Sequence, residues 1–138
     1  MVKTISMQDM RHLNLFNNVT KLRTSHCFSY NDTLMFCVPR PKIQQALGPN
    51  NENLRRISDI VKKRVRVIAL PRGDEDIEYF IKSIVSPVQF KELEINDNEV
   101  LLTAGPQSKA ALLGRNKRRL AEMQRIISDF FKREYKVI

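Results

Sequence analysis

The chain has 138 residues and a hydrophobic content of 42%, enough for a packed core in one ordinary domain or two very small ones. Its net charge of +9 favours a polyanionic partner. No apolar run approaches the roughly 18 residues of a membrane span, and the N-terminus lacks the apolar core of a signal peptide. We therefore expect a cytoplasmic protein with no membrane partner.

The first half of the chain predicts six elements in the order helix, strand, strand, helix, helix, strand. The strands of the first pair flank Asn31-Asp32, which is typical of a hairpin turn. Apolar residues recur at helical spacing in the first and third helices: Met7, Met10, Leu13, Leu15, Phe16, Leu54, Ile57, Ile60 and Val61. The elements cover residues 6–19, 26–30, 33–38, 42–47, 52–63 and 64–70.

The second half predicts the same order after the turn Pro71-Arg72-Gly73. Its first helix has acids at its start and then one apolar stripe of Ile77, Phe80, Ile81, Ile84 and Val85. Its last helix carries apolar residues from Leu120 to Phe131 and is about one turn longer than its counterpart. The other elements are strands at 88–95 and 99–104, a helix at 108–113 and a strand at 134–138.

A short pattern recurs between the second and third helices of each half. ALGPNNENL at 46–54 and LLGRNKRRL at 112–120 both read L-G-x-N-x-x-x-L, with glycines 66 residues apart. Because the pattern and the element order repeat together, we expect two units of about 70 residues each, which is a size marginal for independent stability.

Positive charge is concentrated in the two segments that hold the repeated pattern. Residues 40–70 contain 8 Lys and Arg against 2 Asp and Glu, and residues 109–138 contain 9 against 3. The intervening residues 71–108 contain 3 against 8 and are acidic. This distribution indicates a nucleic-acid footprint, although a solvated basic face would give the same charges.

With this element order the chain resembles the prokaryotic (type II) KH domain, and two such domains in so short a chain resemble the archaeal NusA-type transcription factors. The resemblance covers essentially the whole sequence. It implies an α+β fold with a first KH domain at 1–70 and a second at 71–138, each a three-stranded mixed sheet packed against helices. It also implies a monomer that binds single-stranded RNA in transcription elongation or termination, with RNA polymerase as a partner.

The resemblance places RNA binding at the loop between two helices, where a KH domain uses G-x-x-G to bring backbone amides close to phosphates. Here the second glycine is replaced by Asn51 and by Lys117. Asparagine tolerates the left-handed conformation better than lysine does, whereas lysine adds charge. The predicted RNA-binding residues are Gly48, Pro49, Asn50, Asn51, Arg55, Arg56, Gly114, Arg115, Asn116, Lys117, Arg118 and Arg119.

The resemblance further implies an apolar groove for bases beside each loop. Its candidate residues have spacings that equally suit an ordinary core: Ile43, Leu47, Leu54, Val67, Leu113, Leu120 and Val137.

No arrangement of residues predicts an enzyme, a cofactor or a metal site. His12 and His26 are separated from each other and from the cysteines, Cys27 and Cys37, which we expect to be buried thiols. The two cysteines face each other only if the hairpin loop has three residues. Acids at 74–78 are explained by the dipole of the helix that follows them.

Three other interpretations remain open. A KH protein in RNA processing or at the ribosome would use the same chemistry. Residues 42–63 also fit a helix-turn-helix that binds duplex DNA. Finally, loops without their second glycine fit a protein-interaction scaffold that no longer binds RNA.

Overall fold

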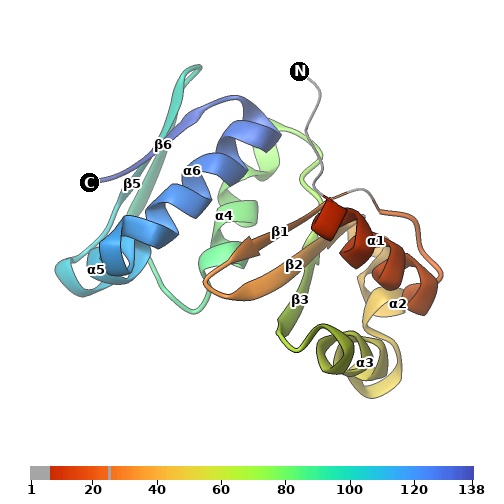
Figure 1. Cartoon of the computed structure of the whole chain (residues 1–138). Coiled ribbons are helices and arrows are strands. Elements are labelled where there is room, and N and C mark those ends of the chain that lie inside the picture. The colour runs from red at the N-terminus through yellow and green to blue at the C-terminus, as the bar shows by residue number, and fades with distance from the viewer. Residues whose placement is uncertain (1–6, 25) are drawn as a thin grey trace. The chain divides into compact units, whose positions relative to one another are not determined.

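The computed structural model describes residues 7–24 and 26–138 and divides the chain into two compact units at Pro71 and Arg72 (Figure 1). Each unit contains one three-stranded mixed sheet and its own helices, so the predicted α+β class is confirmed. Within the described residues, no helix is long and apolar enough to cross a membrane. Ser6, at the predicted start of the first helix, lies outside the described residues.

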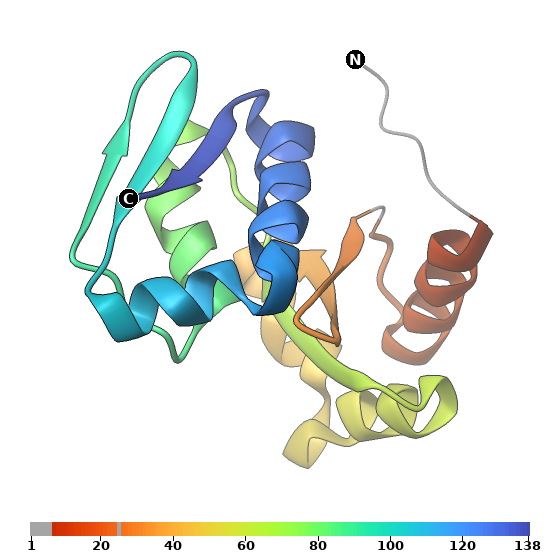
Figure 2. The same ribbon diagram turned by 60° about the vertical axis from the view of Figure 1, so that its left-hand side comes forward.

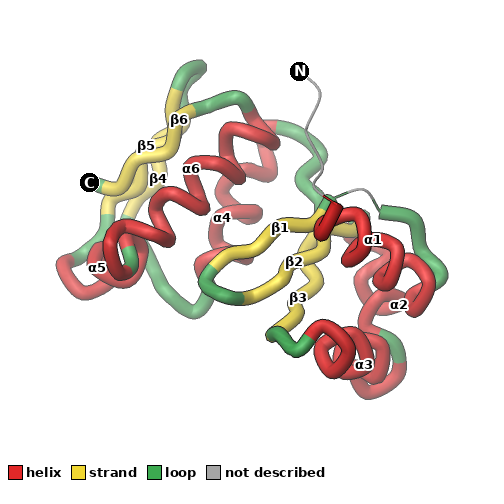
Figure 3. Tube along the Cα trace, viewed as in Figure 1, coloured by secondary structure: helices red, strands yellow, loops and turns green. Residues whose placement is uncertain are grey.

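The first unit has the predicted order of helices and strands (Figure 3). Its sheet has the order β1-β2-β3, in which β1 is antiparallel and β3 is parallel to the central β2. The elements are α1 (Met7–Thr20), β1 (Cys27–Tyr30), β2 (Thr33–Val38), α2 (Ile43–Leu47), α3 (Glu52–Val61) and β3 (Arg64–Ala69).

A two-residue turn fixes the register of the first hairpin. Asn31 and Asp32 have φ of 52° and 57°, as a type I′ turn requires. Cys27 consequently pairs with Phe36 and lies on the opposite face of the sheet from Cys37. The loop thus has two residues, and the three-residue loop that would bring the cysteines face to face does not form. Both are buried thiols rather than a disulfide, as expected.

The core of the first unit receives residues from all three helices and all three strands. Phe16 of α1 stacks on Phe36 of β2 with ring centroids 4.2 Å apart and planes 11° from parallel. Ala46 of α2 and Ile57 of α3 are fully buried in the same cluster. The position of the loop between α2 and α3 is thus set by burial on both of its sides.

Three apolar residues predicted at helix faces are exposed instead. Met10 lies three residues before Leu13, and Met7 lies six residues before it. Three residues of an α-helix fall about 60° short of a full turn, so each step of three moves the side chain further from the buried side. Their exposure accordingly rises to 52% and 71%, against 7% at Leu13. Ile60 is 56% exposed because it lies on the side of Ile57 away from Leu54 and Val61.

The second unit repeats the architecture with the sheet order β4-β5-β6 (Figure 2). β4 is antiparallel and β6 parallel to β5, the central strand. The elements are α4 (Ile77–Val85), β4 (Glu92–Ile95), β5 (Glu99–Thr103), α5 (Pro106–Leu113), α6 (Arg118–Phe131) and β6 (Glu134–Val137).

Helix α4 buries all five residues of its predicted apolar stripe. Phe80 lies with its ring centroid 4.9 Å from that of Phe130 and 5.8 Å from that of Phe131, so aromatic contacts join α4 to the end of α6. The strand predicted from residue 88 begins only at Glu92. The Val88 amide donates to the Val85 carbonyl, which continues the turn after α4.

Arg133 connects three segments of the second unit. Its Nη1 and Nη2 atoms donate to the two carboxylate oxygens of Asp74 at 2.9 and 3.0 Å, and its Nε atom donates to the carbonyl of Asn96 at 2.8 Å. The guanidinium lowers the pKa of Asp74, and the carboxylate raises the pKa of Arg133. Nearby, the Oδ2 atom of the buried Asp76 accepts a hydrogen bond from the backbone nitrogen of Arg72, at 2.9 Å. These two acids thus have defined partners besides the helix dipole.

We predict that Phe16→Ala lowers the free energy of unfolding by about 3 to 5 kcal/mol, because it removes a fully buried, stacked ring. Met10→Ala, an exposed position on the same helix, should cost less than about 0.5 kcal/mol. Urea denaturation of both variants and the wild type measures the difference. Equal losses from the two variants would contradict the assigned core.

We also predict that Arg133→Gln raises the pKa of Asp74 toward its ordinary value, because the bidentate hydrogen bonds hold it down. The stabilisation by this carboxylate is present above the ordinary pKa and is lost as pH falls through the lowered pKa of the folded state. An NMR titration of the Asp74 carboxyl carbon checks this, with Arg125→Gln as the control. An unchanged pKa in the Arg133 variant would refute the contact.

Candidate nucleic-acid interface

One backbone path joins the short helix to the following helix in both units. Gly48 has φ and ψ of 75° and 174°, and Gly114 has 74° and 175°. The second and third residues after each glycine have φ between 52° and 59°, in the left-handed region: Asn50, Asn51, Asn116 and Lys117. The L-G-x-N pattern therefore encodes a specific loop conformation.

The residues that replace the second glycine keep the left-handed conformation that glycine would favour. Asn51 was expected to do so, because asparagine visits this region at modest cost. Lys117 adopts it as well, with φ of 58°. The position is therefore occupied by a cation despite the backbone cost that a Cβ atom brings in this conformation.

The loops lead directly into exposed helix starts. Neither α3 nor α6 has a side-chain hydrogen bond at its N-cap. The first amides of a helix carry partial positive charge, which attracts anions such as phosphate. The side chains of the second loop, from Arg115 to Arg118, are all exposed beside this helix start.

The two loops differ in charge at equivalent positions. Pro49, Asn51 and Glu52 in the first loop correspond to Arg115, Lys117 and Arg118 in the second. The three positions thus carry one negative charge in the first unit and three positive charges in the second. A phosphate backbone would meet strong electrostatic attraction at the second loop and mainly polar groups at the first.

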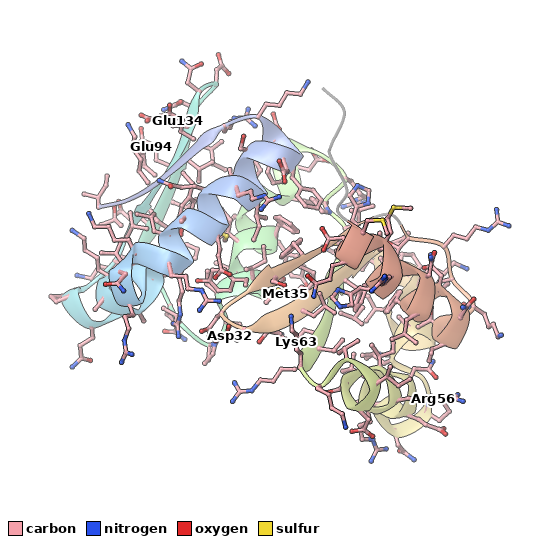
Figure 4. All side chains as sticks on the ribbon, in the orientation of Figure 1. Asp32, Met35, Arg56, Lys63, Glu94 and Glu134 are labelled. Carbon is pink, nitrogen blue, oxygen red and sulfur yellow. The ribbon has the colours of Figure 1, made fainter. Side chains whose placement is uncertain are left out.

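Arg55 and Arg119 donate hydrogen bonds to backbone carbonyls beside the loops. Arg55 donates from Nη2 to the carbonyl of Asn50 at 2.6 Å, and Arg119 donates from Nη1 to the carbonyl of Ala111 at 3.0 Å. In contrast, Arg56 is exposed and projects from α3 away from the strands (Figure 4). Arg55 and Arg119 thus hold the loops, whereas Arg56 extends from α3 into solvent.

All seven candidate groove residues are partly exposed. In the first unit, Ile43, Leu54 and Val67 pack against the core at its edge. Their apolar surface is therefore shared between the core and solvent. This arrangement is compatible with a groove for bases and with an ordinary core.

A second internal repeat marks the ends of α3 and α6. ISDIVKK at 57–63 corresponds to ISDFFKR at 127–133, a spacing of 70 residues that the L-G-x-N comparison does not detect. In each copy a lysine, Lys62 or Lys132, ends the helix with φ of 60° or 56° where glycine is usual. Comparison of the halves at this second spacing would have located these cations.

The histidines and acids form no metal centre among the residues that the structure describes. His12 is half-buried, and burial together with the nearby Lys63 holds its pKa below the ordinary value.

The chain is similar to two proteins named as probable transcription termination protein NusA. That of Methanococcus vannielii is 25% identical over 80% of this chain and 64% of its own length, so the chain spans somewhat less than two thirds of it. That of Halococcus morrhuae is 25% identical over 91% of this chain and 95% of its own length. The resemblance to archaeal NusA proteins is thus confirmed.

A solved structure supports the fold. The protein described as "Crystal structure of APE1850" matches 97% of this chain and 99% of its own with a TM-score of 0.67. At 20% identity, this likeness concerns the fold alone. No protein-family model matches the sequence.

We predict that Gly114→Ser lowers the free energy of unfolding by about 1 to 2 kcal/mol, because φ is positive there. A Cβ at this position would also lie 2.8 Å from Cγ and 3.1 Å from the backbone nitrogen of Arg119. Gly105→Ser is the matched control, since Gly105 has φ of −68° and an added Cβ would meet only Lys91 Cε, at an ordinary contact distance of 3.8 Å. It should change stability by less than about 0.5 kcal/mol. Urea denaturation measures both; equal effects would contradict the loop conformation.

Proposed function

We propose that this protein binds single-stranded RNA through its two glycine loops and acts on nascent transcripts in elongation or termination. In this proposal each unit is a type II KH domain, with residues 1–70 in the first and 71–138 in the second. The loops hold the sugar-phosphate backbone, and RNA polymerase is the protein partner. The observation that carries the proposal is the identical loop path in both units, with three exposed cations at a helix start in the second.

The chemistry of each loop supports contact with phosphates. Glycine allows the backbone to approach a ligand closely, and the uncapped helix start offers amides to an oxygen anion. The proposed contacts are Gly48, Pro49, Asn50, Asn51 and Arg56 in the first unit, and Gly114, Arg115, Asn116, Lys117 and Arg118 in the second. Because the second loop carries the positive charge, we expect it to supply most of the salt-dependent affinity.

The partly exposed apolar residues beside the loops give the bases a surface to contact. Leu54 of α3 and Val67 of β3 retain exposure at the edge of the first core, as do Leu120 and Val137 in the second unit. Apolar side chains contact the faces of all four bases without reading their edges. We therefore expect low sequence specificity.

The similarity to two proteins named as probable transcription termination protein NusA supports the role in transcription. Those proteins carry names of transcription factors rather than of enzymes. The loop chemistry would equally serve a protein in RNA processing or at the ribosome, so it is the names of the relatives that favour nascent transcripts.

The test is fluorescence-anisotropy titration of labelled oligouridine, single-stranded DNA and duplex DNA over a range of salt concentrations. We expect RNA to bind best, with a log-log salt slope of about −3 for roughly four neutralised phosphates. Lys117→Glu/Arg118→Glu should flatten the slope and weaken binding by at least about tenfold, because it reverses two loop charges.

The matched control is Lys82→Glu/Lys91→Glu, which makes the same change in net charge at exposed residues of the same unit outside the loop. It should weaken binding by less than about threefold. Equal losses in the two double variants would show that only net charge matters. Preference for duplex DNA would favour the helix-turn-helix, and absence of binding would favour the scaffold.

A further inference from the structure

In both units, the fifth residue after the loop glycine reaches back across that glycine. Asn53 donates from Nδ2 to the carbonyl of Gln45 at 3.3 Å. Arg119 donates from Nη1 to the carbonyl of Ala111 at 3.0 Å. Each acceptor is the third residue before the glycine, so two different side chains make the same connection in equivalent places.

The acceptors are carbonyls in the last turn of a helix. The last four carbonyls of a helix have no partner within it, and an outside donor stabilises them. The donors come from the first turns of α3 and α6, so each hydrogen bond closes the loop between two helices. Closure in this way limits how far the helices can separate at the loop.

The same side chains add a steric reason for glycine at both positions, besides its positive φ. A Cβ at Gly48 would lie 2.8 Å from the side-chain amide carbon of Asn53, and a Cβ at Gly114 would lie 2.8 Å from Cγ of Arg119. The connecting side chain therefore occupies the space that any larger residue would need. The glycine, the two left-handed residues after it and the bridging side chain therefore act together to shape each loop.

We propose that Asn53 and Arg119 are positioning residues, which hold the loops in the conformation that receives phosphate and do not bind phosphate themselves. This inference rests on the proposed function and removes Arg119 from the predicted contacts. Arg119 is a half-buried residue whose guanidinium donates to a carbonyl of α5, whereas Arg115, Lys117 and Arg118 are exposed residues. Arg55 acts similarly in the first loop, where it donates to the carbonyl of Asn50.

The two units supply the discriminating substitution. Arg119→Asn introduces asparagine, the residue type that makes the equivalent hydrogen bond across the loop of the first unit. It removes the charge and keeps a donor. Arg119→Ala removes both, and Lys117→Gln removes the charge of a proposed phosphate contact.

RNA titrations over a range of salt concentrations separate the roles. We expect Arg119→Ala to weaken binding about threefold to tenfold, as loss of one hydrogen bond does, with an unchanged salt slope. Arg119→Asn should restore affinity to within about twofold, again with the wild-type slope. Lys117→Gln should reduce the slope by about 0.7, the value for one phosphate contact. A similar reduction in Arg119→Asn would overturn the proposal.

Amide hydrogen exchange provides a readout that needs no RNA. The amides of Arg115 to Lys117 should exchange faster in Arg119→Ala than in the wild type and return to the wild-type rate in Arg119→Asn. Asn53→Ala should accelerate exchange only in the first loop. Unchanged exchange in both alanine variants would overturn the positioning role. Failure of the wild type to bind RNA would instead overturn the proposed function. Hydrogen exchange would then still test whether Asn53 and Arg119 hold the loop conformation.

Discussion

Both units depend on a left-handed backbone segment between two helices. In each unit four residues separate the two helices, and they include a glycine near φ 75° and two consecutive residues near 55°. Burial of Ala46 before the first loop and Ile57 after it leaves little freedom in where the helices lie. The backbone must therefore accept conformations that most residues avoid. Asparagine, the residue other than glycine best suited to them, stands at the same place in both loops.

This constraint also separates the residues that shape the loops from those that face solvent. The bridging side chains of Asn53 and Arg119 occupy the space beside the glycines. The exposed loop positions do not shape the backbone in this way, so their residue types can differ between the units. Those positions carry Pro49, Asn51 and Glu52 in one unit and three cations in the other. One scaffold thus presents two surfaces of different charge. In the proposed function, the second unit provides electrostatic affinity and the first adds contacts that depend less on salt.

Periodicity and turn signals predicted most of the fold. The order of elements, the Asn31-Asp32 turn and the five buried residues of α4 follow from local chemistry. Errors arose where spacing alone was used, since Met7 and Met10 share the three-residue spacing of Leu13 and Phe16 but rotate out of the core. The sequence placed Arg55 and Arg119 beside the loops. It could not show that their guanidinium groups donate to backbone carbonyls, because such contacts depend on the path of the folded loop.

The central claim is that the two helix starts after the glycine loops receive the RNA backbone. Two-dimensional NMR of the labelled protein during titration with a short oligouridine tests it most directly. The account predicts the largest amide shift changes at residues 50–53 and 115–119, with smaller changes on the neighbouring faces of α2 and α5. Changes confined to the strands, or the absence of any change at both loops under conditions where RNA binds, would contradict it.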